Sequence, residues 1–189
     1  MLYINGKNAD RLQNSLHALY HECKQIKETI IEYNMLIAYD NSTTNEIMEK
    51  YPLLFSTALD CMRYRIIIGM GHMFDNDKNS LSIEKIMNIF EQVGNKKLNK
   101  IKKDFNKKYL EFDELKSNIK ELRDKMYAHI EIKSSLEDRD IFDIDFEFLN
   151  KQIMKSKELI DYVMEICVKI STEYDNDKLH LAINWKYDK

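Results

Sequence analysis

The sequence predicts an all-α protein, a helical bundle of about five to six helices. Apolar side chains recur at alternating spacings of three and four along several long segments, which is the period of one helix face. Only 4 Gly and 1 Pro occur among the 189 residues, and so few helix breakers favour long helices over many short strands. No repeat or long linker interrupts the pattern. We therefore predict one domain over residues 1–189, with its core at about 9–174 and an extension at 175–189.

The first helix is predicted over residues 9–39, because one apolar stripe runs along all of it. The stripe comprises Leu12, Leu16, Leu19, Cys23, Ile26, Ile30, Tyr33 and Ile37. The polar cluster at 41–44 ends this helix and starts a short one that runs to Lys50.

Pro52 suits the first turn of the next helix, predicted over residues 52–74. This segment is apolar on several faces, so we expect it to be central in the bundle. Gly69 and Gly71 lie near its end, and they would let a neighbouring helix approach closely.

Three further helices are predicted in the second half of the chain. Ser82 can cap a helix that runs to Val93. A helical tract follows over residues 96–131, and Asp145 can cap a last long helix that reaches Tyr174. The stripe of the 96–131 tract is interrupted only at Lys108 and comprises Leu98, Ile101, Phe105, Phe112, Leu115, Ile119, Leu122, Met126 and His129.

Charge and cysteine usage predict a soluble, cytoplasmic protein. The net charge of −3 gives no general attraction to nucleic acid or to a membrane. The three cysteines form no C-x-x-C pair, which is typical of reduced thiols. No apolar segment is long enough to span a bilayer. The segment 75–86 resembles half of an EF-hand loop but lacks its Gly and its final Glu, so we expect no metal and no cofactor.

A lysine-rich segment is the first candidate binding surface. Lys100, Lys103 and Lys107 recur along one helix beside apolar positions. Clustered lysines neutralise backbone phosphates without reading bases, so this face can bind RNA. The alternative interpretation is an ordinary solvated helix face.

The main candidate site is the segment from Arg123 to His129. RNA cleavage needs a group that moves the 2′-hydroxyl proton, and a histidine titrates near pH ~6.5. It also needs a cation on the charged phosphorane, and an arginine fork holds two phosphate oxygens. Six helical residues place the two side chains about 120° apart. They would converge on a phosphate across the helix end or across a two-fold axis with a second copy.

The same loose spacing also fits Arg11 with His17, and Arg65 with His72. Arg123 is distinguished by the fuller pattern around it, with an Asp directly after the Arg and an Ala before the His. The alternative for His129 is a core histidine, because it occupies a position of the apolar stripe.

Leu122-Arg123-Asp124-Lys125-Met126-Tyr127-Ala128-His129 resembles the R-x(4–6)-H signature of the HEPN superfamily (higher eukaryotes and prokaryotes nucleotide-binding). Within it, the segment looks like the AbiU-type abortive-infection HEPN family. The resemblance implies a HEPN-like bundle that forms a homodimer and carries a metal-independent endoribonuclease site at the dimer interface. It also implies a role in phage defence or a toxin–antitoxin system, with RNA as substrate and a cognate antitoxin as partner.

On this resemblance, His129 is the general acid or base and Arg123 stabilises the transition state. Asp124 would orient Arg123 or a neighbouring group, and Lys125 and Tyr127 would contact the phosphate or the base. The alternative function is a non-catalytic HEPN module that binds a partner protein or RNA.

Overall fold

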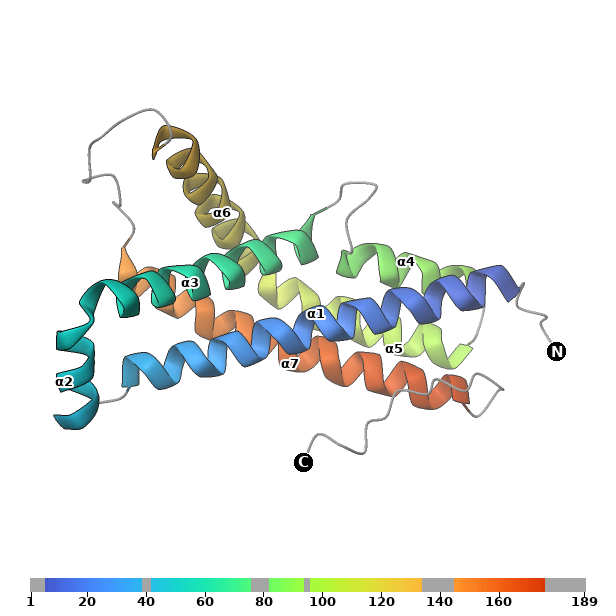
Figure 1. Ribbon diagram of the computed structural model, residues 1–189. Helices are drawn as coiled ribbons and strands as arrows, with labels where there is room; N and C mark the ends of the chain where they lie inside the picture. The colour runs from blue at the N-terminus through green and yellow to red at the C-terminus, as the bar shows by residue number, and fades with distance from the viewer. Residues whose placement is uncertain (1–5, 39–41, 76–81, 94–95, 134–144, 176–189) are drawn as a thin grey trace. The chain divides into compact units, whose positions relative to one another are not determined.

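The prediction of an all-α protein is confirmed. The computed structural model describes residues 6–38, 42–75, 82–93, 96–133 and 145–175, without the side chains at several helix ends, among them those of 127–133. Within these ranges there are seven α-helices, one 3₁₀ helix and no strand (Figure 1). The elements are α1 Gly6–Ala38, α2 Ser42–Lys50, α3 Pro52–Phe74, α4 Ile83–Val93, α5 Lys96–Tyr109, η1 Leu110–Phe112, α6 Asp113–Lys133 and α7 Phe146–Asp175. The predicted extension beyond 175 lies outside the described residues.

Two predicted caps fix the starts of α4 and α7. The Ser82 hydroxyl accepts the backbone N–H of Lys85 at 3.2 Å. The Asp145 carboxylate oxygen Oδ1 accepts the N–H groups of Glu147 and Phe148 at 2.9 and 3.1 Å. Both side chains therefore satisfy N–H groups that a helix cannot bond internally, and both predictions are confirmed.

The predicted tract over 96–131 is divided into two helices, α5 and α6, by the 3₁₀ helix η1. Tyr109 is buried, with 6% of its surface exposed, so the apolar stripe continues through it rather than stopping at Lys108. Asp113 and Glu114 occupy the first turn of α6, where negative charge stabilises a helix start. The division contains no Gly or Pro, so the sequence holds no breaker that would have predicted it.

The chain forms two compact units, and α1 and α7 contribute to both. The first unit contains α1 up to Lys24, α4, α5, η1 and α7 from Leu159 onward. The second contains α1 from Gln25, α2, most of α3, α6 and α7 up to Glu158. The prediction of a single domain over residues 1–189 stays a prediction.

Stacked aromatic rings and two buried thiols contribute to the core of the first unit, beside buried aliphatic side chains such as Leu16 and Ile160. The Phe105 ring of α5 lies between two others, stacked on Tyr109 at 5.2 Å and on Tyr162 of α7 at 5.6 Å between centroids. Cys23 of α1 and Cys167 of α7 are both buried. Burial raises the pKa of Cys167 to about 12. The pKa of Cys23 is also raised well above its ordinary value, first by burial and then by Cys167.

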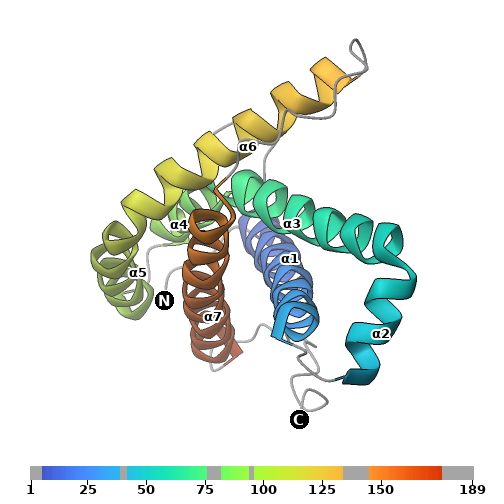
Figure 2. The ribbon, with the colours of Figure 1, turned by 90° about the vertical axis from the view of Figure 1, so that its left-hand side faces the viewer.

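In the second unit, polar contacts join four helices beside the apolar core. The Tyr33 hydroxyl of α1 donates to Asn150 Oδ1 of α7 at 2.5 Å and accepts Arg63 Nε of α3 at 3.1 Å. Asn118 of α6 donates to Gln152 of α7 at 3.2 Å. In both ribbon views the last part of α1 runs beside the first part of α7 (Figures 1 and 2). These contacts fix the rotation of α3 and α6 about their axes.

The expectation that α3 is central holds only for its second half. Residues 66–71 are all buried, as the apolar pattern predicted. Leu53 and Leu54, next to Pro52 at the start, are 77% and 65% exposed. The prediction was wrong for the first half of α3, because an apolar sequence does not specify how far the neighbouring helices extend along it. Among the described helices, none is long and apolar enough to cross a membrane.

Candidate functional site

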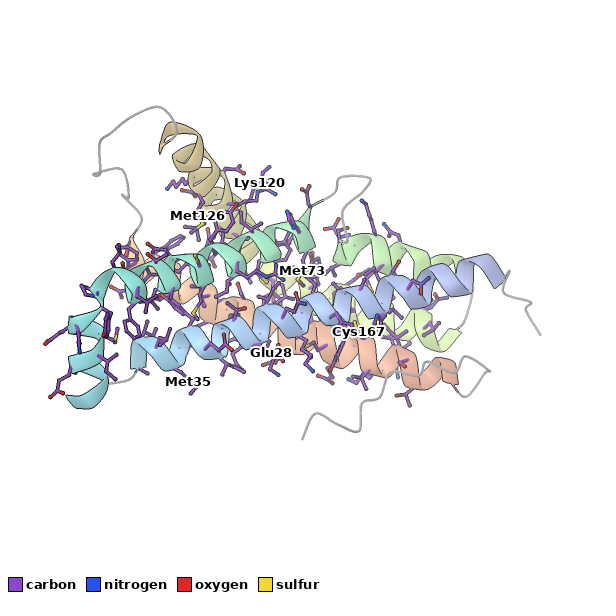
Figure 3. The ribbon with its side chains drawn as sticks, in the orientation of Figure 1. Glu28, Met35, Met73, Lys120, Met126 and Cys167 are labelled. Carbon is purple, nitrogen blue, oxygen red and sulfur yellow. The ribbon has the colours of Figure 1, made fainter. Side chains whose placement is uncertain are left out.

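The predicted motif lies on α6, whose backbone is helical from Asp113 to Lys133. A buried stripe that includes Ile119, Leu122 and Met126 faces the second unit's core, and Figure 3 labels Met126 on this helix. Arg123 follows Leu122 and therefore sits at the edge of the stripe, where its side chain is 19% exposed. The motif's arginine is thus held against the protein, with part of its surface open to solvent.

Arg123 forms an ion pair with its neighbour Asp124. The Nε and Nη2 groups of the arginine both donate to Asp124 Oδ1, at 3.2 and 3.1 Å. The Asp124 side chain is 57% exposed. An arginine bonded through two nitrogens to one carboxylate has fewer accessible rotamers than a free one, so the pair restricts where the guanidinium lies.

The stem of Arg123 lies against α3 at Gly71. A Cβ built on this glycine would be 2.8 Å from Arg123 Cδ, 3.6 Å from Cγ and 3.7 Å from Nη1. The expected close approach at Gly71 therefore occurs, and the neighbour is this arginine of α6. Sequence reasoning expected an approaching helix at Gly71 but did not connect the glycine with the motif. The sequence feature that could have indicated this contact is a glycine that follows a run of apolar residues in a predicted helix.

The positions of Tyr127 and His129 belong to α6, but their side chains lie outside the described residues. Along an α-helix, His129 lies about 9 Å from Arg123 and about 120° around the axis. Whether His129 faces a core or a cleft stays a prediction. Lys125 is 53% exposed and forms an ion pair with Glu121 at 2.7 Å.

The two other Arg–His spacings have different surroundings. His17 is exposed and lies against His21, with the two Nε2 atoms 3.2 Å apart. The side chain of Arg11 lies outside the described residues. Arg65 donates to Gln25 at 2.8 Å, and His72 is exposed on α3.

The lysine face is the exposed side of α5 formed by Lys100, Lys103 and Lys107. Leu98 and Phe105 are buried on the other side of the helix. All five residues belong to the first unit, whereas Arg123 belongs to the second. The face has the exposure that an RNA-binding surface and a solvated helix face both require.

The sequence did not predict a cation–π cluster that forms around Arg63 in the second unit. The Arg63 guanidinium lies over the Phe146 ring at 4.6 Å and over the Tyr33 ring at 5.5 Å. It also forms an ion pair with Asp60 at 3.0 Å. Because it joins α1, α3 and the start of α7, we assign it a structural role. No group of three or more potential metal ligands occurs in the described ranges.

The chain belongs to the HEPN superfamily, and its helix α6 carries Arg123 and Asp124 ahead of His129. The resemblance seen in the sequence is therefore confirmed. The particular family is AbiU2: its model, HEPN_AbiU2, matches residues 9–188, and the chain is a member of that family. It is therefore a HEPN module of an abortive-infection, defence-related type. No curated protein and no solved structure matches the chain.

Proposed function

We propose that the chain is a metal-independent endoribonuclease of prokaryotic defence, of the abortive-infection or toxin–antitoxin type. The observation that carries the proposal is the restrained cation on α6. Arg123 is held between Gly71 and the Asp124 carboxylate, six positions before His129 on the same helix. A preorganised charge of this kind stabilises a transition state without reorganising during the reaction.

In the proposed reaction, the 2′-oxygen of one nucleotide attacks the adjacent phosphorus while the bond from phosphorus to the 5′-oxygen breaks. The 2′-hydroxyl loses a proton and the departing 5′-oxygen takes one up. The products carry a 2′,3′-cyclic phosphate and a 5′-hydroxyl. His129 moves one of these protons, as a histidine can at neutral pH. Arg123 donates N–H groups to the phosphorane oxygens.

The other motif residues have supporting roles in this proposal. Asp124 orients Arg123, to which it is bonded through two nitrogens. Lys125 and Tyr127 contact the phosphate or the base; Lys125 would exchange its ion pair with Glu121 for the substrate. The chain acts as a homodimer, because a second copy can bring together two side chains that diverge by about 120° on one helix. A cognate antitoxin is the proposed protein partner.

The test is RNA cleavage by the purified chain in excess EDTA. We expect cleavage, and we expect His129→Ala and Arg123→Ala each to remove most of it. A lost general acid or base costs ~10²–10⁴-fold, and a lost donor to the transition-state charge costs ~10²–10³-fold. The two losses will not add fully in the double variant, since residues that act as one unit fail together. Circular dichroism and sedimentation will show whether each variant stays folded and dimeric.

His17→Ala and Arg11→Ala are matched controls, because they fit the same loose spacing outside the fuller motif. We expect both to cleave at the wild-type rate. If they lose as much activity as the motif variants, the site is placed wrongly. A requirement for a divalent ion contradicts the mechanism. If no RNA is cut and His129→Ala unfolds, the chain is a non-catalytic HEPN module with a core histidine.

A further inference from the structure

Gly71 is the point at which α3 and the arginine of the motif come closest. It is buried, and so are the five residues before it, 66–70. Its missing Cβ would be 2.8 Å from Arg123 Cδ, whereas carbon atoms in contact are at least about 3.5 Å apart. An alanine at this position therefore requires Arg123 or α3 to shift by about 0.7 Å before the two carbon atoms reach an ordinary contact distance.

Arg123 is the partner that would move. On α3 Ile67 and Met70 are fully buried, and on α6 Leu122 and Met126 anchor the backbone with 3% and 7% of their surfaces exposed. Moving either helix would disturb a packed core. The arginine stem has several rotatable bonds and can yield at small energetic expense. A displaced Cδ carries the guanidinium with it and alters its bonds to Asp124.

We propose that Gly71 is a positioning residue for Arg123: the absence of a side chain on α3 sets where the guanidinium lies. This inference rests on the proposed endoribonuclease function, in which that guanidinium binds the phosphorane. Catalysis depends steeply on such placement, and a displacement of about 1 Å can cost ~10²-fold in rate. Gly71 need not touch RNA to control cleavage.

The cleavage activity and the Tm are expected to respond differently to Gly71→Ala. Alanine favours a helix interior more than glycine does, so the helix gains stability from Gly71→Ala. The yielding arginine adds only a small opposing cost. We therefore expect the Tm of Gly71→Ala to equal or exceed that of the wild type while its activity falls. A glycine with a merely structural role would lose Tm and activity together.

The experiment compares full-length wild type, Gly71→Ala and Gly69→Ala. Gly69 is also buried on α3, but it lies about 200° around the helix from Gly71, so it is the matched control. Three quantities are measured: the rate of RNA cleavage in EDTA, the Tm, and the ¹⁵N–¹H resonance of the Arg123 Nε group. That resonance is assigned by its disappearance in Arg123→Ala. For Gly71→Ala we expect cleavage to fall about 10–100-fold, the Nε resonance to shift, and the Tm to be retained. Gly69→Ala leaves the Nε resonance unmoved.

A wild-type cleavage rate or an unshifted Nε resonance in Gly71→Ala overturns the inference. If Gly71→Ala lowers the Tm, the Tm of the double variant with Arg123→Ala shows which group the new methyl group overlaps. Recovery of the Tm shows that the overlap is with Arg123, and no recovery means that Gly71 is only a packing residue. A wild type that cuts no RNA refutes the proposed function, and the Nε resonance then still tests whether Gly71 places Arg123.

Discussion

Cys23 and Cys167 are thiols whose pKa is raised above its ordinary value. Both are buried in the first unit, whereas Cys61 is exposed on α3. Burial raises the pKa of Cys167 to about 12 from an ordinary value of 9.0. The folded protein therefore keeps this thiol proton at pH values where the unfolded chain has released it.

This proton makes the free energy of unfolding depend on pH. Above pH 9 the unfolded chain binds fewer protons than the folded one, so stability falls as pH rises. The contribution is complete below pH 9 and is lost as pH approaches 12. Between pH 7 and pH 10, we expect Cys167 alone to remove on the order of 1 kcal/mol.

Urea unfolding of wild type and Cys167→Ala at a series of pH values measures this loss. The variant should show a shallower fall in stability above pH 9. Cys61→Ala, which removes an exposed thiol, is the control. Equal falls in all three proteins would mean that the buried thiol titrates no differently from one in the unfolded chain.

At the scale of single residues, the sequence predicted the buried stripes well. Leu12, Leu16 and Leu19 of α1 are buried as the four-three spacing requires, and so are Leu115 and Ile119 of α6. Ile37, which the same spacing placed in the α1 stripe, is 46% exposed. The approach of Arg123 to Gly71 was not predictable. It joins positions far apart in the chain, and it depends on how α3 and α6 are rotated about their axes, which a single sequence does not encode locally.

Among the elements, α5 presents a row of exposed lysines that either binds RNA or is only solvated. Its exposed lysines are spaced so that several could follow one RNA backbone. Replacing Lys100, Lys103 and Lys107 with Gln should weaken RNA binding similarly for all sequences. The slope of log K against log salt should decrease by about two, at ~0.7 for each phosphate that a lysine no longer neutralises.

The control for the lysine face removes the same charge elsewhere. Lys50, Lys151 and Lys169 are exposed on α2 and α7, and replacing all three with Gln lowers the net charge equally. Fluorescence titrations with single-stranded RNA at several salt concentrations compare the two triple variants. If both behave alike, α5 presents only a solvated face.

The starts of α4 and α7 were predicted from their capping side chains, whereas the junction of α5 and α6 was missed. Ser82 and Asp145 bond to backbone N–H groups beyond them, so residue type alone located these starts. The junction of α5 and α6 at 110–112 contains no glycine or proline. Tertiary packing decides such a junction, because the 3₁₀ turn changes the direction of side chains without any change in composition.

For the whole molecule, the proposed dimer predicts complementation between inactive variants. If each site combines Arg123 of one copy with His129 of the other, a mixed dimer of Arg123→Ala and His129→Ala retains one intact site. Random exchange should then restore about a quarter of the wild-type activity. The measurement is RNA cleavage after co-refolding of equal amounts, with each variant alone as control. No recovery in proven mixed dimers would mean that each copy supplies both residues of its own site.

Neither unit is a continuous stretch of chain, because segments of α1 and α7 belong to both. During synthesis, domains usually fold as units in the order in which they emerge from the ribosome. Neither unit of this protein can be completed in that way before α7 emerges. Residues 146–158 of α7 belong to the second unit, and its residues from 159 onward belong to the first. Nascent chains interrupted before α7 would therefore contain no finished core. On the proposed endoribonuclease function, activity would therefore appear only after α7 has been translated, and incomplete translation products would leave cellular RNA intact.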